Sequence, residues 1–329
     1  MRIAVDAMGG DHAPQEIIKG SLEALRQDPD LHILLVGQEE TIKKYLEGDY
    51  DKNRLGIVHC TEVIAMDDHP ATAYRRKKDA SITVATRLVK EGQAAAVVSA
   101  GSTGGQMVAA LFGLGRIAGV DRPGIGTVFP TLQGPKLLLD AGANTDCKPE
   151  NLVQFAKMGR VYAQQILGIP NPKVHLLSNG EEATKGNELV IKAHEILKNT
   201  PGLNFQGNIE GRDVLSGKSD VMVCDGFVGN TVLKVIEGTA GAIFTLMKEE
   251  MTKSLRSKLG AFMLYPALKA LKGRMDYSAY GGAPLLGVKG VSIICHGSSK
   301  APAIRNAIRV AKECVDNKFV ETLAQSIEE

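Results

Sequence analysis

Seven short, strongly apolar runs, separated by segments with helical spacing, set the tightest constraint on how this chain can fold. Most of these runs are apolar on consecutive residues and do not alternate with polar ones. This pattern is typical of strands in a parallel sheet that helices cover on both faces. The runs are "RIAVDA" (2–7), "HILLVG" (32–37), "AAAVVSA" (94–100), "KLLLDA" (136–141), "KVHLLS" (173–178), "VMVCD" (221–225) and "VSIIC" (291–295).

The segments between the runs carry the spacing of amphipathic helices. Pro14 suits a first helical position. One helical face follows it at Ile17, Ile18, Ser21, Leu22 and Leu25, and another lies at Leu189, Val190, Ala193, Ile196 and Leu197. Strands that alternate with helices predict an open α/β sheet. Because the chain has 329 residues, 44% hydrophobic, with no internal repeat or obvious linker, we expect a single α/β domain over residues 1–329.

Charge and cysteine usage exclude several classes of protein. Lysine and arginine (39) nearly balance aspartate and glutamate (37), so no charge excess points to nucleic acid as a partner. The N-terminus meets two glycines and an aspartate before a signal-peptide core could form, and no apolar run approaches the roughly 18 residues of a membrane-spanning helix. We therefore expect a cytoplasmic protein. Five scattered cysteines without a C-x-x-C pair argue against disulfides and zinc: Cys60, Cys147, Cys224, Cys295 and Cys314.

Four turns that follow predicted strands share one composition, glycine with Ser, Thr or Asn. They are "SAGSTGG" (99–105), "SNGEEATKGNE" (178–188), "DGFVGNT" (225–231) and "HGSS" (296–299). Taken singly, each turn is better explained by chain reversal and helix capping. Because ligands of open parallel sheets bind beyond the carboxyl ends of the strands, four such turns at the same end of one sheet predict a phosphate-lined crevice.

Two segments resemble nucleotide-binding loops without meeting their requirements. "GRDVLSGKS" (211–219) has five residues between its glycines where the Walker A loop has four, and a strand follows it instead of preceding it. "GLGRIAG" (113–119) lies within or at the end of a helical pattern, and "GSTGG" is not G-x-G-x-x-G. The sequence therefore argues against a dinucleotide cofactor.

Nine motifs, taken together, indicate a family. In chain order they are "VDAMGGDHAP", "RRKKDAS", "SAGSTGG", "LLLDAGANTDCKPE", "TKGNEL", "GNIEGRD", "DGFVGNTVLK", "YGGAPLLGVKG" and "HGSS". This set resembles the phosphate acyltransferases of bacterial phospholipid synthesis, which make acyl-phosphate from acyl-acyl carrier protein. The family pattern reads "SAGNTGA" where Ser102 and Gly105 stand here, so a hydrogen-bonding group is kept but the amide is not.

The resemblance implies a fold, an assembly and partners. We expect a Rossmann-like three-layer α/β/α fold with a mainly parallel sheet, akin to phosphotransacetylase and the isopropylmalate dehydrogenases. It also implies a homodimer without a cofactor, an acyl carrier protein and orthophosphate as substrates, and a membrane glycerol-3-phosphate acyltransferase as a downstream partner. The predicted reaction is the attack of phosphate on a thioester, which feeds phospholipid synthesis.

The chemistry of that reaction fits the residue types in the chain. Phosphate is itself the nucleophile, and a thiol with a pKa of about 8.5 leaves with little protonation, so neither an enzyme nucleophile nor a strong acid is obligatory. The sequence has no G-x-S-x-G elbow and no obvious triad. Positioning of two substrates contributes about 7–11 kcal/mol and one oxyanion donor about 3–4 kcal/mol, so these two effects could suffice.

Three residues are the candidates for catalysis: Lys185, Asn230 and His296. Lys185 could neutralise phosphate or the oxyanion, and its alternative is an ordinary surface lysine. His296 could bind phosphate or protonate the leaving sulfur, although a lone histidine is more often structural. The predicted phosphate-binding residues are Gly101, Ser102, Thr103, Gly104, Asn187, Asn208, Gly226, Gly229, Thr231 and Ser298. Helix capping and turn formation are the alternative roles of these residues.

Acidic residues and one cysteine near the strand ends have competing interpretations. Asp6, Asp11, Asp140 and Asp225 could hold a metal, but capping and lysine pairing are the commoner roles, and we predict no metal. Cys295 precedes His296 on a strand, so the two side chains point to opposite faces and cannot work as a nucleophile and base. We predict a buried thiol.

Two basic segments are candidates for handling the acyl donor. Residues 252–274 contain six lysines or arginines and no acid, within a predicted amphipathic helical excursion over 245–280 that Pro266 divides or kinks. We expect it to contact an anionic membrane or the carrier protein, and a dimer interface is the alternative. The predicted contact residues are Lys253, Arg256, Lys258, Leu259, Phe262, Met263, Leu264 and Lys269, with Arg75, Arg76, Lys77 and Lys78 for the carrier.

Three other functions remain open at this point. A phosphotransacetylase-like enzyme using acyl-coenzyme A shares the chemistry, and a metal- or NAD-dependent dehydrogenase shares the predicted fold. A non-catalytic carrier-binding or membrane adaptor would keep the basic segment and release no thiol. Our prediction is a long-chain acyl-acyl carrier protein:phosphate acyltransferase that is cytoplasmic and peripherally associated with the membrane.

Overall fold

All seven predicted strands are present. The computed structural model describes residues 1–46, 50–274 and 280–328, so residues 275–279 of the predicted excursion lie outside the described part of the chain. The predicted runs form β1 (Arg2–Asp6), β2 (His32–Gly37), β4 (Ala96–Ser99), β6 (Gly134–Leu139), β7 (Val174–Ser178), β9 (Val221–Val223) and β11 (Val291–Ile294). Runs of consecutive apolar residues therefore identified strands correctly.

Four further strands complete the sheet, and two of them introduce antiparallel pairings. They are β3 (Leu55–His59), β5 (Gly124–Thr131), β8 (Phe205–Glu210) and β10 (Ala283–Leu286). The 11-stranded sheet has the order β3-β2-β1-β4-β11-β10-β5-β6-β9-β7-β8. Most neighbours are parallel, but β10 is antiparallel to both β11 and β5, and β5 is antiparallel to β6.

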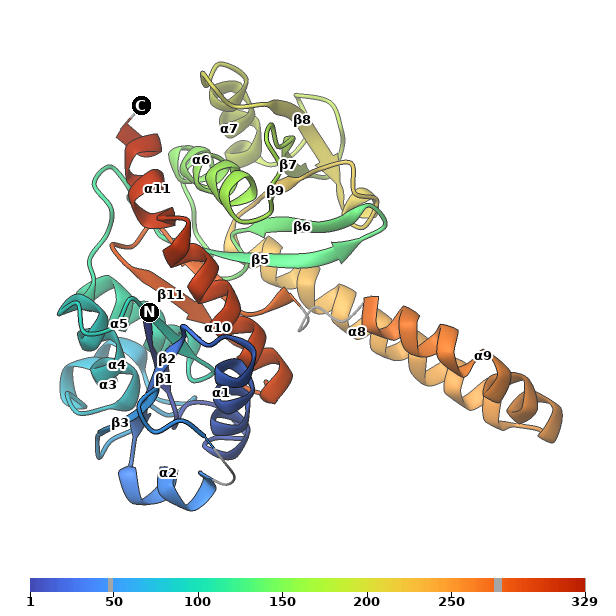
Figure 1. Ribbon diagram of the computed structural model, residues 1–329. Coiled ribbons are helices and arrows are strands. Elements are labelled where there is room, and N and C mark those ends of the chain that lie inside the picture. The colour runs from blue at the N-terminus through green and yellow to red at the C-terminus, as the bar shows by residue number, and fades with distance from the viewer. Residues whose placement is uncertain (47–49, 275–279, 329) are drawn as a thin grey trace.

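Helices cover the sheet, and two of them form a hairpin that leaves it (Figure 1). The helices are α1 (Gln15–Gln27), α2 (Glu39–Tyr45), α3 (Pro70–Arg76), α4 (Ser81–Lys90), α5 (Thr103–Gly113), α6 (Pro149–Gln165), α7 (Glu188–Lys198), α8 (Gly226–Thr252), α9 (Leu255–Arg274), α10 (Ala301–Asp316) and α11 (Phe319–Glu328). The hairpin of α8 and α9 projects away from the rest of the molecule. Pro266 lies inside α9, and the chain reverses earlier, between Thr252 and Leu255. Of the two alternatives expected at Pro266, division into two helices is therefore wrong, and Pro266 lies within one continuous helix.

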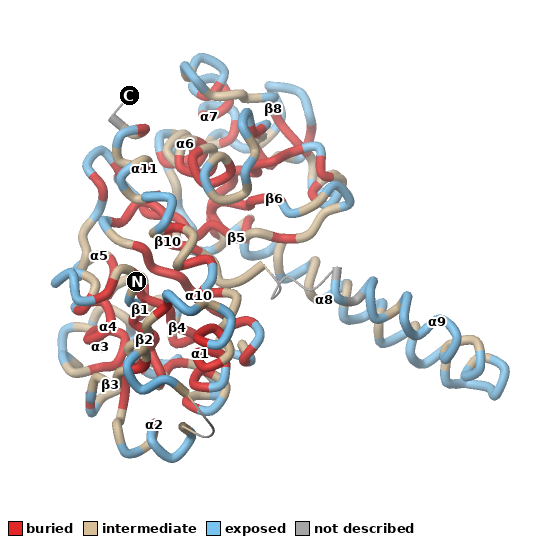
Figure 2. Tube along the Cα trace, in the orientation of Figure 1, coloured by how far each residue is buried: buried red, intermediate tan, exposed pale blue. Residues whose placement is uncertain are grey.

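Strands with two apolar faces explain the consecutive apolar runs. In β1, Ile3 and Val5 pack with α1 and α10 in one core, whereas Ala4 packs with α4 in another. In β6, Leu137 and Leu139 face α6, and Leu138 belongs to a cluster with α8. The central strands are buried along their length (Figure 2). Burial of a leucine- or valine-sized side chain stabilises the fold by about 1.5–3 kcal/mol, so both faces contribute.

The antiparallel strands overturn one expectation about the site. Three antiparallel pairings separate β11 from β6, so β4 and β11 run opposite to β6, β9 and β7. The four glycine-rich turns therefore do not lie at the same end of one sheet. They form two groups, one after β4 and β11 and one after β9 and β7, and β6 also ends with the second group.

Candidate functional site

Glycines from three turns meet after β1, β4 and β11. A Cβ added to Gly9 would lie 2.7 Å from the Gly101 nitrogen, and one added to Gly10 would lie 3.1 Å from the Gly297 carbonyl oxygen. The Asp11 amide also donates to the Gly297 carbonyl at 2.8 Å. We call Gly9, Gly10, Gly101 and Gly297 the glycine corner. No larger residue allows these backbones to approach so closely.

A buried carboxylate holds the glycine corner in place. Asp6 accepts hydrogen bonds from the amides of Met8 and Gly9 at 3.1 Å and from the Ser99 hydroxyl at 2.7 Å. The Ser99 hydroxyl oxygen in turn accepts from the Gly101 amide at 3.0 Å. Burial raises the pKa of Asp6, and these hydrogen bonds act in the opposite direction. Asp6 therefore fixes backbone positions, which agrees with a structural role for the acid at this strand end.

Helix α5 begins beside the glycine corner. Ser102 is its N-cap, and the hydroxyl oxygen accepts from the Gly105 amide at 3.3 Å. A Cβ on Gly104 would lie 2.6 Å from the Pro70 ring, so α3 covers this end of α5. Within the described residues, the amides of Thr103 and Gly104 have no hydrogen-bond acceptor. These two amides are available to an anion, whereas the Ser102 side chain is used for capping.

The second group of turns is built around Asp140. Asp140 is fully buried, and its carboxylate accepts five hydrogen bonds of 2.7–3.1 Å. The donors are the amides of Ile125, Gly142, Ala143 and Asn144 and the Asn144 side chain. Burial raises the pKa of Asp140, and the donors act in the opposite direction. Asp140 therefore holds the whole loop that follows β6.

This loop packs tightly against the first turn of α8. The Gly226 amide donates to the Asn144 carbonyl at 2.7 Å, and Asp225 caps the helix by accepting from the Val228 amide at 2.9 Å. A Cβ added to Gly229 would lie 1.9 Å from the Asp140 carbonyl oxygen. The small residues of "DGFVGN" thus serve close packing and capping, and the amides of Gly226 and Val228 are already used. Asn230 and Thr231 are exposed on the next turn.

Lys185 and Asn187 lie together at the start of α7, as predicted. Asn187 is the N-cap and accepts from the Val190 amide at 3.0 Å, and the Lys185 side chain is exposed. Asn208 on β8 is buried, and its amide donates to the Glu182 carbonyl at 2.9 Å, which also accepts from the Lys185 amide at 3.0 Å. His194 Nδ1 contacts the Asn208 oxygen at 3.0 Å. Asn208 therefore positions the Lys185 loop.

One contact joins α8 to the glycine corner. Lys234 Nζ lies 3.4 Å from His296 Nε2, and His296 Nδ1 lies 2.8 Å from the Ser298 hydroxyl. The sequence analysis did not select Lys234. Its position four residues after Asn230 places both side chains on the same helix face, and this spacing was the available signal. Asn230, Lys234, His296 and Ser298 form a polar strip from α8 to the turn after β11.

Comparisons with known proteins identify the family. Residues 1–322 match the model of a family described as "Fatty acid synthesis protein". A phosphate acyltransferase of Heliobacterium modesticaldum is 59% identical over 329 residues, covering 99% of this chain and 98% of the relative. A second, from Desulfitobacterium hafniense, is 60% identical over 328 residues, covering 99% and 97%. The chain belongs to the phosphate acyltransferase family. This confirms the predicted enzyme class and the predicted synthesis of acyl-phosphate for phospholipids.

A solved structure supports the fold of the chain. A phosphotransacetylase from Streptococcus pyogenes superposes with a TM-score of 0.64 at 19% identity, covering 100% of this chain and 94% of that one. The similarity confirms the predicted Rossmann-like α/β fold. The family membership also implies an acyl carrier and phosphate as substrates.

The predicted basic contact residues differ in their surroundings. Lys77 donates to the Val63 carbonyl at 2.9 Å and to Asp68 at 2.5 Å, so its charge is engaged within the chain. Arg75 and Arg76 are exposed at the end of α3, and Lys78 Nζ lies 4.8 Å from the centre of the Tyr74 ring. On the hairpin, exposed side chains of the predicted set are Lys253, Arg256, Lys258, Leu259, Phe262, Met263, Leu264 and Lys269. No helix in the described ranges is both long and apolar enough to cross a membrane.

Four of the five cysteines are buried thiols, as predicted, whereas Cys147 is partly exposed. Burial raises the pKa of Cys295 to about 12, and the same cause raises those of Cys60 and Cys314 to about 12. Cys295 is 4% exposed, whereas the neighbouring His296 is exposed, so the two side chains point in different directions. A thiol with so high a pKa is not a nucleophile at neutral pH.

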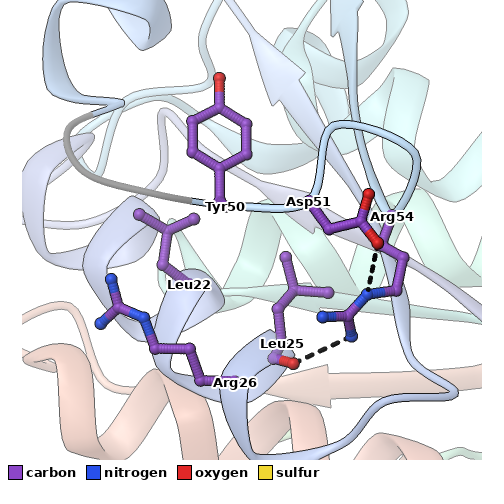
Figure 3. A pocket seen from close by; sticks show the side chains of 6 residues that line it. All are labelled: Leu22, Leu25, Arg26, Tyr50, Asp51 and Arg54. Carbon is purple, nitrogen blue, oxygen red and sulfur yellow. Dashed lines mark hydrogen bonds and ion pairs between the residues drawn. The ribbon is translucent and has the colours of Figure 1, made fainter.

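A hollow of ≈ 260 Å³ lies away from these turns (Figure 3). It is lined by Leu22, Leu25, Arg26, Tyr50, Asp51 and Arg54. Arg54 contacts Asp51 at 3.2 Å and donates to the Leu25 carbonyl at 2.9 Å, so it closes the end of α1. Because β3 starts directly after Arg54, the hollow lies at the amino edge of the strands, opposite to the glycine corner, and has no place in the acyl-transfer site.

Proposed function

We propose that the protein transfers a long-chain acyl group from acyl carrier protein to orthophosphate at the junction between the two groups of turns. The observation that carries this proposal is the contact of Lys234 with His296, which brings the Asn230 face of α8 to the glycine corner. This contact places cationic and neutral donors beside the turn after β11, and α5, with its two open amides, begins at the same glycine corner. Such an arrangement suits a small oxyanion and the oxyanion of a tetrahedral intermediate.

The proposed mechanism needs no covalent enzyme intermediate. A phosphate oxygen attacks the thioester carbon, the carbonyl oxygen takes the negative charge, and the carbon–sulfur bond then breaks to release thiolate. Thr103 and Gly104 amides are the proposed phosphate donors, with Gly101 and Ser298 beside them. Lys185, at the start of α7, is proposed to neutralise charge on the acyl-donor side, and the Asn187 NH₂ group to donate a hydrogen bond there. The loop that carries Lys185 is held by Asn208.

The test mixes protein, orthophosphate and acyl-acyl carrier protein, and captures acyl-phosphate with hydroxylamine. Acyl-phosphate should form only when phosphate is present, and faster than with acyl-coenzyme A at equal concentration. Lys185→Ala should lower kcat by about tenfold or more while the circular dichroism spectrum is unchanged. Release of no thiol by the wild-type protein would favour the adaptor, and a preference for acyl-coenzyme A would favour the phosphotransacetylase-like function.

The carrier protein is proposed to dock at the end of α3, where Arg75, Arg76 and Lys78 present charge beside the last turn of α5, since Tyr74 stacks on Phe112. Carrier proteins that are acidic would be attracted by these side chains, so affinity should fall as salt rises. Double replacement of Arg75 and Arg76 by alanine should raise the KM for acyl-acyl carrier protein and leave that for phosphate unchanged. An unchanged KM for the carrier would remove α3 from the proposal.

Helix α9 is proposed to bind an anionic membrane through one of its two apolar faces. Ser257, Gly260 and Ala261 are partly buried on the face toward α8. The opposite face exposes Leu255 (86%), Leu259, Phe262 (80%) and Met263, with Arg256 and Lys258 beside them. An exposed apolar row flanked by cations suits a peripheral contact with anionic lipid. Cosedimentation should therefore require anionic vesicles and weaken with salt. Equal binding to neutral vesicles would contradict an electrostatic contribution.

A homodimer is proposed to cover the rest of the hairpin. Val235, Ile243 and Leu246 expose large apolar side chains along α8, where no part of the described chain covers them. A second copy would bury this row, because obligate homodimer interfaces are rich in apolar side chains. Light scattering should report twice the mass of one 35.1 kDa chain, and Ile243→Asp should reduce the measured mass.

We also propose that the one sheet constitutes a single cytoplasmic catalytic domain, which passes its product to a membrane glycerol-3-phosphate acyltransferase.

A further inference from the structure

His296 links Lys234 to the turn after β11. Its Nε2 lies 3.4 Å from Lys234 Nζ. Its Nδ1 lies 2.8 Å from the Ser298 hydroxyl, and the Ser298 amide donates to the same nitrogen at 3.3 Å. These contacts hold the imidazole ring beside the Lys234 ammonium group.

The ammonium group of Lys234 remains accessible to an anionic ligand. Its other partner is Glu237, one turn later on α8, at 3.1 Å, and its side chain is 52% exposed. Among the residues that the structure describes, Glu237 is the one carboxylate that pairs with this ammonium group. Lys234 is therefore a solvent-accessible cation at the point where α8 meets the glycine corner, and an anion can approach it from the open side.

We propose that Lys234 binds the attacking orthophosphate, and that its contact with His296 orients the ammonium toward the glycine corner. This inference rests on the proposed function and deepens it by assigning the nucleophile's site. The bound ion is hydrogen phosphate, whose unprotonated oxygen forms the new carbon–oxygen bond. The carbon–sulfur bond breaks with its electron pair on sulfur, and the thiolate takes a proton from water. His296 neither gives nor takes a proton in this sequence, and it acts as a positioning residue.

Steady-state kinetics on Lys234→Ala separate a phosphate site from a structural role. Loss of a charge-assisted hydrogen bond should raise the KM for phosphate about tenfold or more, with the KM for the acyl donor within about twofold of wild type. Lys234→Arg keeps the charge and should recover part of the loss. The matched control is Lys248→Ala, another exposed lysine on α8, which should behave as wild type. An unchanged KM for phosphate, or an equal rise in both KM values with a lower Tm, overturns the proposal.

A binding measurement without an acyl donor makes the result independent of the acyl-transfer activity. Inorganic phosphate titrated into the wild-type protein should broaden its ³¹P resonance, and Lys234→Ala should abolish the broadening. Phosphate binding in the wild type that is lost in Lys234→Ala supports the site even when no acyl-phosphate is made. Equal broadening with both proteins overturns it.

Discussion

Asp140→Asn is expected to lower the free energy of unfolding by about 2–6 kcal/mol, although the two side chains have nearly the same shape. One carboxylate oxygen of Asp140 accepts three N–H groups and the other accepts two, at 2.7–3.1 Å. An asparagine must place its NH₂ group where one of these oxygens stands. At least two buried donors then face another donor, and each costs about 1–3 kcal/mol when it is left unsatisfied.

Urea unfolding followed by circular dichroism measures this effect. The midpoint should fall with the slope unchanged, because the loss is in native-state stability. Asp146→Asn is the matched control, since Asp146 is exposed in the same loop, and it should leave the midpoint in place. If Asp140→Asn changed the free energy of unfolding by less than about 0.5 kcal/mol, the carboxylate would not hold the loop as argued.

Three further predictions follow from single contacts. Gly229→Ala should destabilise the protein by about 1–3 kcal/mol or more, because its Cβ would lie 1.9 Å from the Asp140 carbonyl oxygen; Gly238→Ala, with open space around it, should not lower the Tm. Cys295, whose pKa is raised to about 12 by burial, should resist iodoacetamide at pH 8 until urea is added. The stability that burial of this thiol contributes should be lost as the pH rises from about 8.5, the pKa of an unfolded thiol, toward 12. Asn208→Ala should lower kcat several-fold by releasing the Lys185 loop, and wild-type turnover would refute this positioning role.

The strands that the sequence pattern missed are the ones that its rule does not cover. The pattern identifies strands buried on both faces, and β3 and β8 lie at the two edges of the sheet. In β5, "GIGTVFPT" is interrupted by glycine and proline, and β10, "APLL", has proline at its second position. Missing β5 and β10 had the largest consequence, because their antiparallel pairings reverse half of the sheet.

The candidate site was predicted only in part, because some of its contacts join segments that are far apart in the chain. Glycine-rich turns after strands and the cap formed by Asn187 could be predicted, since each depends on a few neighbouring residues. Lys234 was missed because its partner His296 is 62 residues away in the chain. "DGFVGN" was expected to bind an anion, but the Gly226 amide donates to the loop after β6 and the Val228 amide donates to the cap residue Asp225.

The sequence by itself determined seven of the strands, the burial of four of the thiols and the membership of the chain in an acyltransferase family. These properties follow from local hydrophobic spacing, from capping residues and from motifs, all of which act over a few residues. Only the tertiary structure decided which glycines pack against which backbone, which amides stay open and which lysine meets His296. Those facts depend on contacts between segments far apart in the chain, and the order and direction of the strands in the sheet determine them.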